Sequence, residues 1–161
     1  CCNGVCLTAT DIDFKNNQYF FKVNVGEETQ LRTTFGKNLL NKSYFINLEK
    51  SLKIGDEISG HFVYGHVDRT TKLHKLNNLD NSWEFCFNNF ENNDSRYIVD
   101  KASIAINGIS LTIANVSKEF FSISVISHTY DNTNLKFLKK NDYVNVEFDY
   151  LARFSSGEIY R

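Results

Sequence analysis

Apolar and polar residues alternate along several short stretches of this chain, and the period is two. A period of two puts successive side chains on opposite faces of a strand, so each stretch predicts a half-buried β-strand. Helical periodicity is scarce, and only residues 38–41 and 47–55 could each form a turn of helix, the second ended by Gly55. Short strands with little helix predict an all-β fold built on a small antiparallel barrel. The apolar positions are Phe21, Val23 and Val25; Trp83, Phe85 and Phe87; Phe121, Ile123 and Val125; and Val144, Val146 and Phe148.

Three stretches of the chain recur in the same order. NGVCLT at residues 3–8 matches NGISLT at 107–112, EETQLRTTF at 27–35 resembles SHTYDNTNL at 127–135, and YFINLEKSL at 44–52 resembles YVNVEFDYL at 143–151. Asn3 and Asn107 are 104 residues apart, Thr29 and Thr129 are 100 apart, and Asn47 and Asn145 are 98 apart. Three matches in register predict a tandem duplication of a unit of about 100 residues, which is an ordinary domain size.

The duplication predicts two units with unequal front ends, residues 1–61 and residues 62–161. In the second unit 45 residues precede Asn107, whereas only two residues precede Asn3 in the first. About 43 residues are therefore expected to be missing from the front of the first unit, and the absence of any Met agrees with this expectation. The predicted architecture is two barrels in tandem, of which the first is incomplete.

Composition narrows the possible functions. The net charge of −1 provides no basic surface for nucleic acid, and no apolar run is long enough for a membrane span or a signal peptide. The four cysteines, Cys1, Cys2, Cys6 and Cys86, fit no disulfide framework, so we expect reduced thiols in a cytoplasmic protein. The alternative is a zinc site made by Cys1, Cys2, Cys6 and a histidine, but adjacent cysteines rarely reach one tetrahedral ion together.

The repeated hexamer offers a candidate site. Alternation places Cys6 and Thr8 on one face of a strand, and it places Ser110 and Thr112 on one face in the second copy. These hydroxyls could simply face solvent on the outside of a sheet. However, free cysteine tends to be buried, so its exchange for serine between two copies favours a pair of similar but non-equivalent sites.

The motifs together resemble those of riboflavin synthase of the alpha-chain type and of its flavin-binding relatives, the lumazine proteins. The resemblance is carried by NGVCLT, NGISLT, INLEKSL, GHFVYGHV, SHTYDNTNL and VNVEFD, and it runs from Cys1 to about Phe154. It implies an all-β fold of two tandem six-stranded Greek-key β-barrels, here with an incomplete first barrel, followed by a short C-terminal helix. It also implies a homotrimer, with the active site between barrels of two subunits, and an association with lumazine synthase.

The reaction that the resemblance implies is the dismutation of two 6,7-dimethyl-8-ribityllumazine molecules. One molecule gives a four-carbon unit to the other, and the products are riboflavin and 5-amino-6-ribitylamino-pyrimidinedione. No metal or redox cofactor is implied, because the lumazine ring itself can delocalise a carbanion formed at its 7-methyl group. A duplicated fold suits this reaction, because two copies of one substrate must be held face to face in different roles.

The resemblance assigns catalysis to Cys6, His66, Ser110 and Asp149, with Asp149 expected to activate Ser110. The alternatives are that Cys6 only shapes the pocket and that Asp149 lies on a solvated strand face. His66 is the expected proton carrier, and the alternative is a structural histidine held beside Gly65. His61 is expected to be structural, and His128 is either a wall of the ribityl pocket or a plain surface residue. The expected substrate-binding residues are Cys6, Leu7, Thr8, Asn24, Val25, Gly26, Glu27, Glu28, Thr29, Gly65, His66, Val67, Lys101, Ser110, Leu111, Thr112, Ile126, Ser127, His128, Thr129, Tyr130 and Asp131.

Two other functions compete with this enzyme. The first is a lumazine or flavin carrier of the same fold that performs no reaction, although a carrier has no need of Cys6, His66, Ser110 and Asp149. The second is a small barrel that binds oligonucleotides, which the acidic balance and the lack of a basic, aromatic strand face argue against.

Overall fold

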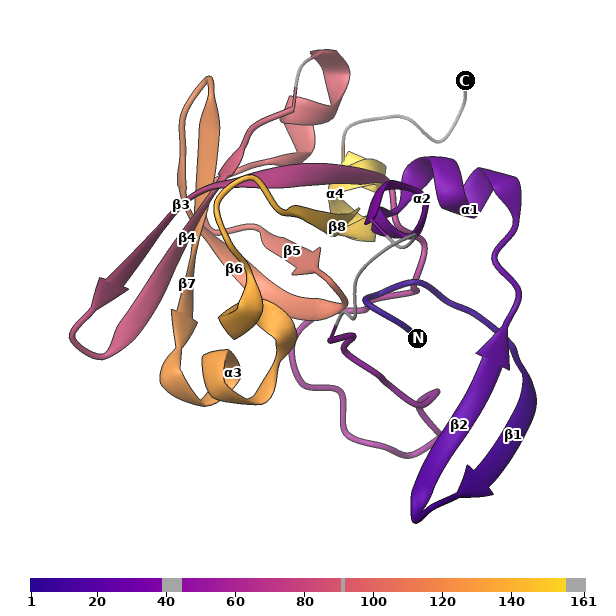
Figure 1. Ribbon diagram of the computed structural model, residues 1–161. Coiled ribbons are helices and arrows are strands. Elements are labelled where there is room, and N and C mark those ends of the chain that lie inside the picture. The colour runs from indigo at the N-terminus through magenta and orange to yellow at the C-terminus, as the bar shows by residue number, and fades with distance from the viewer. Residues whose placement is uncertain (39–44, 91, 156–161) are drawn as a thin grey trace.

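The chain folds around one closed barrel of six antiparallel strands. The computed structural model describes residues 1–38, 45–90 and 92–155. The barrel follows the order β3-β4-β7-β6-β5-β8 and closes from β8 back to β3 (Figure 1). This arrangement confirms the all-β prediction. The strands are β3 (Arg69–Leu79), β4 (Ser82–Asn88), β5 (Ser103–Ile106), β6 (Ile109–Val116), β7 (Phe120–Ile126) and β8 (Tyr143–Phe148).

The barrel has a Greek-key connection. Strands β5, β6 and β7 follow one another through short turns and pair in sequence. Strand β8 then returns over a longer connection and pairs with β5, the first of the three. This spatial order, in which the fourth strand lies beside the first, defines a Greek key.

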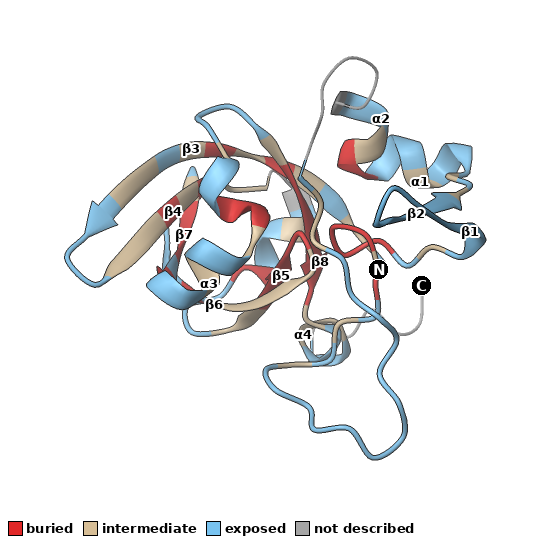
Figure 2. Ribbon diagram, turned by 60° about the horizontal axis from the view of Figure 1, so that its bottom comes forward, coloured by how far each residue is buried: buried red, intermediate tan, exposed pale blue. Residues whose placement is uncertain are grey.

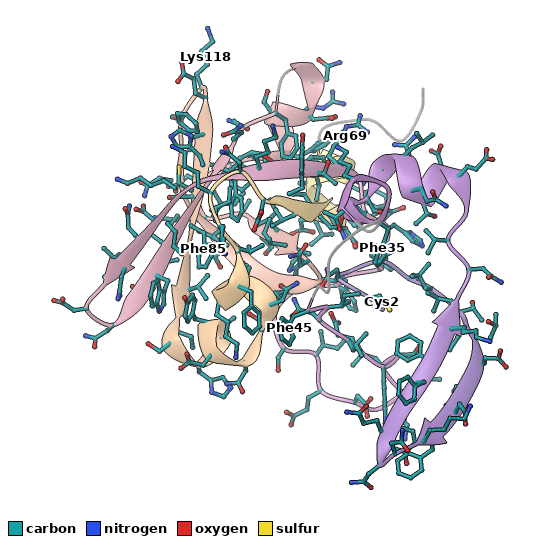
Figure 3. All side chains as sticks on the ribbon, viewed as in Figure 1. Cys2, Phe35, Phe45, Arg69, Phe85 and Lys118 are labelled. Atoms are coloured by element: carbon teal, nitrogen blue, oxygen red, sulfur yellow. The ribbon has the colours of Figure 1, made fainter. Side chains whose placement is uncertain are left out.

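The core fills the barrel interior, as the period-two pattern predicts. Buried residues concentrate inside the barrel, whereas the long loop before it is exposed (Figure 2). Strand β4 illustrates the pattern, because Phe85 and Phe87 are fully buried while the alternate residues Glu84 and Cys86 are only half-buried. Figure 3 shows Phe85 among the side chains of the barrel. Closing the sheet removes its edges and packs one face of every strand against the others. The fully buried side chains are Leu73, Phe85, Phe87, Ile104, Ile106, Ile113, Phe121, Ile123, Val125, Leu135, Val144 and Val146.

The N-terminal part of the chain forms a separate two-stranded sheet. Strands β1 (Ala9–Lys15) and β2 (Gln18–Val23) make a hairpin that stands away from the barrel (Figure 1). The hairpin exposes large apolar side chains, and Ile12 and Tyr19 are 74% and 78% exposed. The described strands therefore give one closed barrel and one hairpin, and a tandem pair of barrels stays a prediction.

The helices are short. They are α1 (Glu27–Arg32), α2 (Thr34–Asn38), the 3₁₀ turn η1 (Asn92–Tyr97), α3 (Ser127–Asn132), the 3₁₀ turn η2 (Asn134–Phe137) and α4 (Tyr150–Ser155). None of the helices in the described ranges is both long and apolar enough to pass through a membrane. Residues 39–41 of the first expected helical turn lie outside the described residues, and α2 ends at residue 38.

The helical turn expected at residues 47–55 is wrong. This stretch is extended because its backbone is used by the start of the chain. Leu48 forms a β-bridge with Cys2, and the Glu49 N–H donates to the Cys1 carbonyl over 3.0 Å. A helix would need those backbone groups for its own hydrogen bonds, so tertiary pairing overrides the local helical pattern.

The two Asn-Gly turns of the repeated hexamers meet at the junction between the N-terminal part and the barrel. Asn3 and Asn107 have φ values of 47° and 48°, and the glycine after each also has a positive φ. A Cβ on Gly4 would lie 2.6 Å from the backbone nitrogen of Gly108, so the two turns are in backbone contact. Such a turn favours Asn-Gly because both central residues need positive φ, and the contact additionally requires glycine for lack of space.

Four asparagine side chains fasten this junction through matched hydrogen bonds. The Asn47 N–H donates to Asn3 Oδ1 over 2.8 Å, and the Asn145 N–H donates to Asn107 Oδ1 over 2.9 Å. In return, Asn47 Nδ2 donates to the Asn107 carbonyl and Asn145 Nδ2 donates to the Asn3 carbonyl. The sequence comparison aligns Asn3 with Asn107 and Asn47 with Asn145, so equivalent residues make equivalent bonds, and the crossed bonds join the N-terminal part to the barrel.

The remaining oxygens of this network fix two further segments. Asn47 Oδ1 accepts from the Asn134 N–H, and Asn145 Oδ1 accepts from the Thr34 N–H, both over 2.8 Å. Beside them, Phe45 stacks on Phe137 with ring centroids 4.1 Å apart. The segments that follow α1 and α3 are therefore both held at the junction.

Removing one amide should loosen the whole junction. Asn145→Ala leaves the Thr34 N–H and the Asn3 carbonyl without their partner in a buried place, and each such group costs about 1–3 kcal/mol. We expect the free energy of unfolding, measured by urea denaturation, to fall by about 2–4 kcal/mol. The control is Asn115→Ala, because Asn115 is an exposed residue of β6. Equal midpoints for the two variants would contradict this account of the junction.

Candidate functional site

The loop that precedes β3 contacts the side chain of Ser110. Ser110 stands in β6, and its hydroxyl oxygen receives the His61 backbone N–H over 3.2 Å and lies 2.7 Å from His61 Nδ1. Gly60 has a φ of +91°, and a Cβ placed on it would lie 2.4 Å from Ser110 Oγ. Glycine at this position therefore allows the loop to approach the serine.

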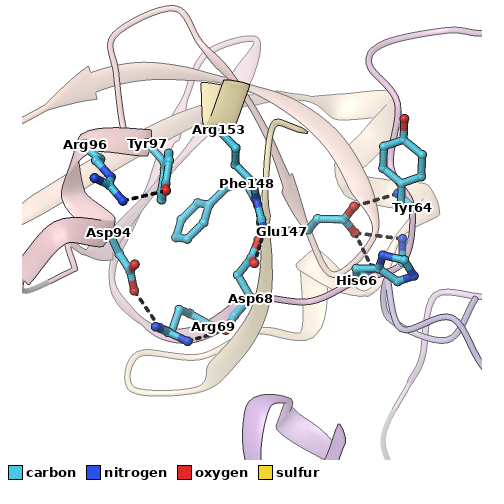
Figure 4. A network of polar contacts seen from close by, with 11 residues as sticks. Tyr64, His66, Asp68, Arg69, Asp94, Arg96, Tyr97, Glu147, Phe148 and Arg153 are labelled. Carbon is cyan, nitrogen blue, oxygen red and sulfur yellow. Dashed lines mark hydrogen bonds and ion pairs between the residues drawn. The ribbon is translucent and has the colours of Figure 1, made fainter. Parts of the chain in front are cut away.

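Further along the same loop, the buried carboxylate of Glu147 holds three consecutive amides. Its Oε1 accepts from the Tyr64 N–H over 2.7 Å, and its Oε2 accepts from Gly65 and His66 over 2.9 and 3.0 Å (Figure 4). Bonds from N–H groups to an ionised carboxylate are among the stronger hydrogen bonds in proteins. Strand β8 thus fixes the backbone of the GHV segment, residues 65–67, and determines where the His66 side chain begins.

A second carboxylate holds the next turn of the loop. Asp68 accepts from the Phe148 N–H over 2.8 Å and forms an ion pair with Arg153 of α4 (Figure 4). Its own N–H donates to the Val146 carbonyl over 2.9 Å. The loop, strand β8 and helix α4 are therefore joined before β3 begins.

Cys6 of the first hexamer lies against this loop. The Cys6 N–H donates to the Gly65 carbonyl over 2.8 Å, and a Cβ on Gly65 would lie 2.8 Å from Cys6 Cβ. Gly65 is buried at a φ of +79°, whereas Cys6 itself is exposed. The structure therefore brings together Cys6, Gly65 and His66 from the expected site.

One short loop thus contacts the cysteine of one hexamer and the serine of the other. His61 contacts Ser110 and Gly65 contacts Cys6. Because four residues of extended chain span at most about 14 Å, the backbones of His61 and Gly65 lie no farther apart than that. The groups assembled along this loop are an exposed thiol, a hydroxyl and two imidazoles. Imidazole, thiol and hydroxyl groups are the kinds of side chain that serve in general acid–base catalysis.

Two of the expected binding stretches lie at strand-to-helix junctions. Residues 24–29 include the link between β2 and α1 and the first turn of α1, and residues 126–131 run from the last residue of β7 through most of α3. Each helix has a threonine at its C-cap, and the hydroxyl of that threonine donates to a carbonyl of the helix. Thr33 Oγ1 donates to the Thr29 carbonyl, and Thr133 Oγ1 donates to the Thr129 carbonyl. The aligned sequences therefore form similar local structures. On α1, Glu28 additionally forms an ion pair with Arg32.

Other expected residues have structural contacts of their own. Asp149 caps α4 by accepting the Leu151 N–H over 2.9 Å, and no hydrogen bond within the described ranges joins it to Ser110. The Tyr130 ring stacks on Trp83 with centroids 4.0 Å apart. Lys101 has a φ of 65° and donates its N–H to the Ile113 carbonyl, while Thr8, Thr112 and His128 are exposed.

An open apolar hollow of about 410 Å³ lies between the hairpin and the start of the chain. Leu7 is the only expected site residue in its wall, so the hollow is separate from the contacts of Ser110. Its volume is in the range of small-molecule sites. Its wall is formed by Cys1, Cys2, Leu7, Ala9, Ile12, Tyr19, Phe20, Phe21, Val23, Leu48, Glu49 and Lys50.

The cysteines differ in environment. All four are free thiols, and burial raises the pKa of Cys2, which keeps it protonated and unreactive. Burial, together with the charge of Glu84, also raises the pKa of Cys86. Cys6 is the exposed one, and the described residues contain no group of three side chains able to hold a metal ion.

Sequence reasoning missed three features that build this site. Gly60, Glu147 and the contact of His61 with Ser110 appear only in the folded chain. Their partners are 49 to 83 residues away, so no local pattern could reveal them. The signal available was the glycine that precedes each histidine in GHFVYGHV.

Filling the space beside Gly65 should separate the loop from the first hexamer. In Gly65→Ala the new methyl group would meet the Cys6 backbone at 2.8 Å, at a backbone conformation that alanine disfavours. We expect the free energy of unfolding to fall by about 1–3 kcal/mol. Gly26→Ala is the control, because nothing lies within 4 Å of its Cβ position and its φ is −66°. A Gly65→Ala variant as stable as that control would show that the contact is not tight.

Comparison with known proteins matches the part of this site that lies in the barrel to a described domain. A family model, the lumazine binding domain, matches residues 64–149, which include GHV, Ser110 and Glu147. The riboflavin synthase of Meyerozyma guilliermondii is 35% identical over 99% of this chain, and the chain spans 66% of that relative's length. The riboflavin synthase of Actinobacillus pleuropneumoniae is 37% identical over 94% of the chain, which spans 67% of it.

The fold has solved counterparts. The structure of LumP with 6,7-dimethyl-8-(1'-D-ribityl) lumazine superposes with a TM-score of 0.75 at 21% identity. The match covers 91% of this chain and 75% of that one. LumP with riboflavin gives the same TM-score at 22% identity. At this identity the likeness establishes a shared fold.

Proposed function

The chain belongs to the riboflavin synthase family, and we propose from this premise that it converts two molecules of 6,7-dimethyl-8-ribityllumazine to riboflavin and 5-amino-6-ribitylamino-pyrimidinedione. In this reaction a four-carbon unit passes from one lumazine to the other. The observation that carries the proposal is the identity of 35–37% with riboflavin synthases over 94–99% of the chain. The relatives come from fungi and bacteria, so the match is not restricted to one lineage.

The contacts of the two hexamers support a site for two unequal substrates. Cys6 and Ser110 occupy equivalent positions in the repeated sequence, and both touch the loop at residues 60–66. Because the implied active site lies between barrels of two subunits, a ring beside Cys6 of one subunit would meet a ring beside Ser110 of a neighbouring subunit, which replaces a rare encounter by a fixed geometry. The exchange of thiol for hydroxyl makes the two positions chemically different, as donor and acceptor roles require.

Each expected residue takes a role in this proposal. Ser110 and Cys6 contact the rings, and His66 carries protons from the loop that Glu147 fixes. Residues 24–29 and 126–131 surround the ribityl chains. Asp149 contributes to catalysis from its place at the start of α4. The lumazine ring delocalises the carbanion, so this chemistry uses no cofactor.

A turnover assay tests the proposal. The chain is mixed with 6,7-dimethyl-8-ribityllumazine, and riboflavin is followed by absorbance and fluorescence. We expect Ser110→Ala and Cys6→Ser each to lower kcat by about 10–1,000-fold, because each removes a group that acts in the transition state.

The outcomes distinguish the enzyme from the carrier. Lumazine that binds and stays unchanged would favour the non-catalytic lumazine or flavin carrier, a function consistent with the LumP-like fold. Turnover that survives both substitutions would reject the two residues as catalytic groups. Asn115→Ala is the control, since it should leave kcat unchanged.

We further propose that the units are residues 1–61 and 62–161, that the protein is a homotrimer in the cytoplasm, and that it associates with lumazine synthase. The free thiols support a reducing compartment. Helix α4 supports self-association, because Tyr150, Leu151 and Phe154 leave 46%, 72% and 47% of their surfaces exposed. Neighbouring exposed apolar side chains of this kind are typical of contact surfaces between subunits.

A charge on α4 should therefore disrupt the trimer. Leu151→Asp places a carboxylate in an apolar contact, and we expect light scattering after size exclusion to give a monomer mass in place of a trimer mass. Val116→Asp is the matched control, because it changes an exposed apolar residue on the β6–β7 hairpin. A monomeric parent protein would contradict the trimer.

A further inference from the structure

Cys1 and Cys6 lie opposite each other across the first Asn-Gly turn. Cys2 and Val5 exchange two backbone hydrogen bonds of 2.9 Å and close the turn. The next pair outward, Cys1 and Cys6, is therefore a non-hydrogen-bonded pair, and the Cys6 N–H points away from it to the Gly65 carbonyl. The α-carbons of such a pair are about 4.5 Å apart, a separation that a disulfide can span.

The second hexamer shows the same register in a regular ladder. The residues aligned with Cys1 and Cys6 are Ala105 and Ser110, which are direct partners between β5 and β6. Side chains of directly opposite residues lie on one face of a sheet. Alanine and serine have no thiol to oxidise, so the first copy alone carries a pair of thiols at this position.

The two side chains converge on the space beside Gly65. A Cβ placed on Gly65 would lie 3.0 Å from Cys1 Sγ and 2.8 Å from Cys6 Cβ, so both cysteines approach the same point. Cys1 is half-buried and Cys6 is exposed, which lets a small reagent reach the pair. Rotation about the Cα–Cβ bonds can then bring the two sulfurs together without a change in the backbone.

The other two cysteines are poorly placed for this reaction. Cys2 is 7% exposed, and alternation along the strand directs it to the opposite face from Cys1. Cys86 lies on β4 of the barrel. Burial raises the pKa of both thiols, and the protonated thiol is the unreactive form.

We propose that Cys1 and Cys6 are a dithiol site for small-molecule disulfides of the glutathione type, and that their oxidation to a disulfide inactivates the site that contains Cys6. The Cys6 thiolate attacks one sulfur of the reagent, whose S–S bond breaks and releases one thiolate. The Cys1 thiol then loses its proton to solvent, attacks the Cys6 sulfur and releases the second thiolate. The protein loses two electrons and two protons, and the reagent becomes two thiols.

The bond itself is independent of the proposed function, whereas the inactivation rests on it, because Cys6 there contacts a substrate ring. The pair stays open where reduced glutathione predominates and closes when the balance shifts toward the disulfide form. Exposed disulfides of this kind are typically labile and regulatory.

The first test locates the bond without any activity. The protein is treated with oxidised glutathione, denatured, alkylated and cleaved with trypsin, which leaves residues 1–15 as one peptide for mass spectrometry. We expect alkylation of Cys2 alone in this peptide, with a mass lower by two hydrogens at the other two cysteines, and alkylation of all its cysteines after dithiothreitol. Full alkylation after oxidation, glutathione retained on Cys6, or a bond to Cys2 or Cys86 would overturn the proposal.

The second test distinguishes an internal bond from a mixed disulfide, with Cys1→Ser as the variant. Closing the internal bond releases two glutathione molecules, whereas a mixed disulfide on Cys6 releases one. Diluting both forms of glutathione tenfold at a constant ratio should therefore raise the ratio of oxidised to reduced parent protein about tenfold and leave that of Cys1→Ser unchanged. Cys86→Ser is the control and should respond as the parent does. A parent protein that does not respond would overturn the proposal.

The third test connects the bond to turnover. We expect the oxidised parent to form riboflavin about 10–1,000-fold more slowly, as Cys6→Ser does, and to recover in dithiothreitol. Before oxidation, Cys1→Ser should be as active as the parent. Unchanged turnover in protein that carries the bond would overturn the inactivation. A bond that forms in a protein making no riboflavin in either state would contradict the proposed function and support the dithiol site, and riboflavin formation without any bond would do the reverse.

Discussion

The contact between the two Asn-Gly turns is the constraint on which the rest of the structure depends. The turns approach so closely that neither glycine could carry a side chain. Four asparagines surround them and satisfy the backbone groups that this approach would otherwise leave buried without partners. Through Asn47 and Asn145 the same network holds the segments after α1 and α3, so it orients the N-terminal part against the barrel.

The candidate site inherits its geometry from this junction. The hexamers that contain Cys6 and Ser110 begin at the two turns, so the junction sets how far apart the thiol and the hydroxyl lie. The loop at residues 60–66 then lies across both, and the buried Glu147 carboxylate keeps its backbone in place. Ser110 therefore stands on a strand, and hydrogen bonds from the backbone fix the segments that carry Cys6 and His66, which suits a site with fixed geometry.

The sequence predicted local structure well where one face of a strand is buried, as at Phe85 and Phe121, because burial imposes a period of two. It failed at residues 47–55, where pairing with Cys1 and Cys2 overrides the helical pattern. The resemblance named Cys6, Gly65 and His66 as site residues, and the folded chain places Cys6 against Gly65. The sequence could not find the partner of Ser110, since a contact across 49 residues depends on the path of a loop that no periodicity encodes.

The asparagine junction also bears on the chemical lifetime of the protein. Asparagine is among the thermolabile residues, and losing its side-chain amide converts it to an acid. Asn3 and Asn107 are 8% and 2% exposed, in a neutral network whose oxygens accept and whose amides donate. A negative charge formed there would be costly to bury and would find no cation among its bonded neighbours. Deamidation of one of these asparagines would therefore weaken the junction between the N-terminal part and the barrel.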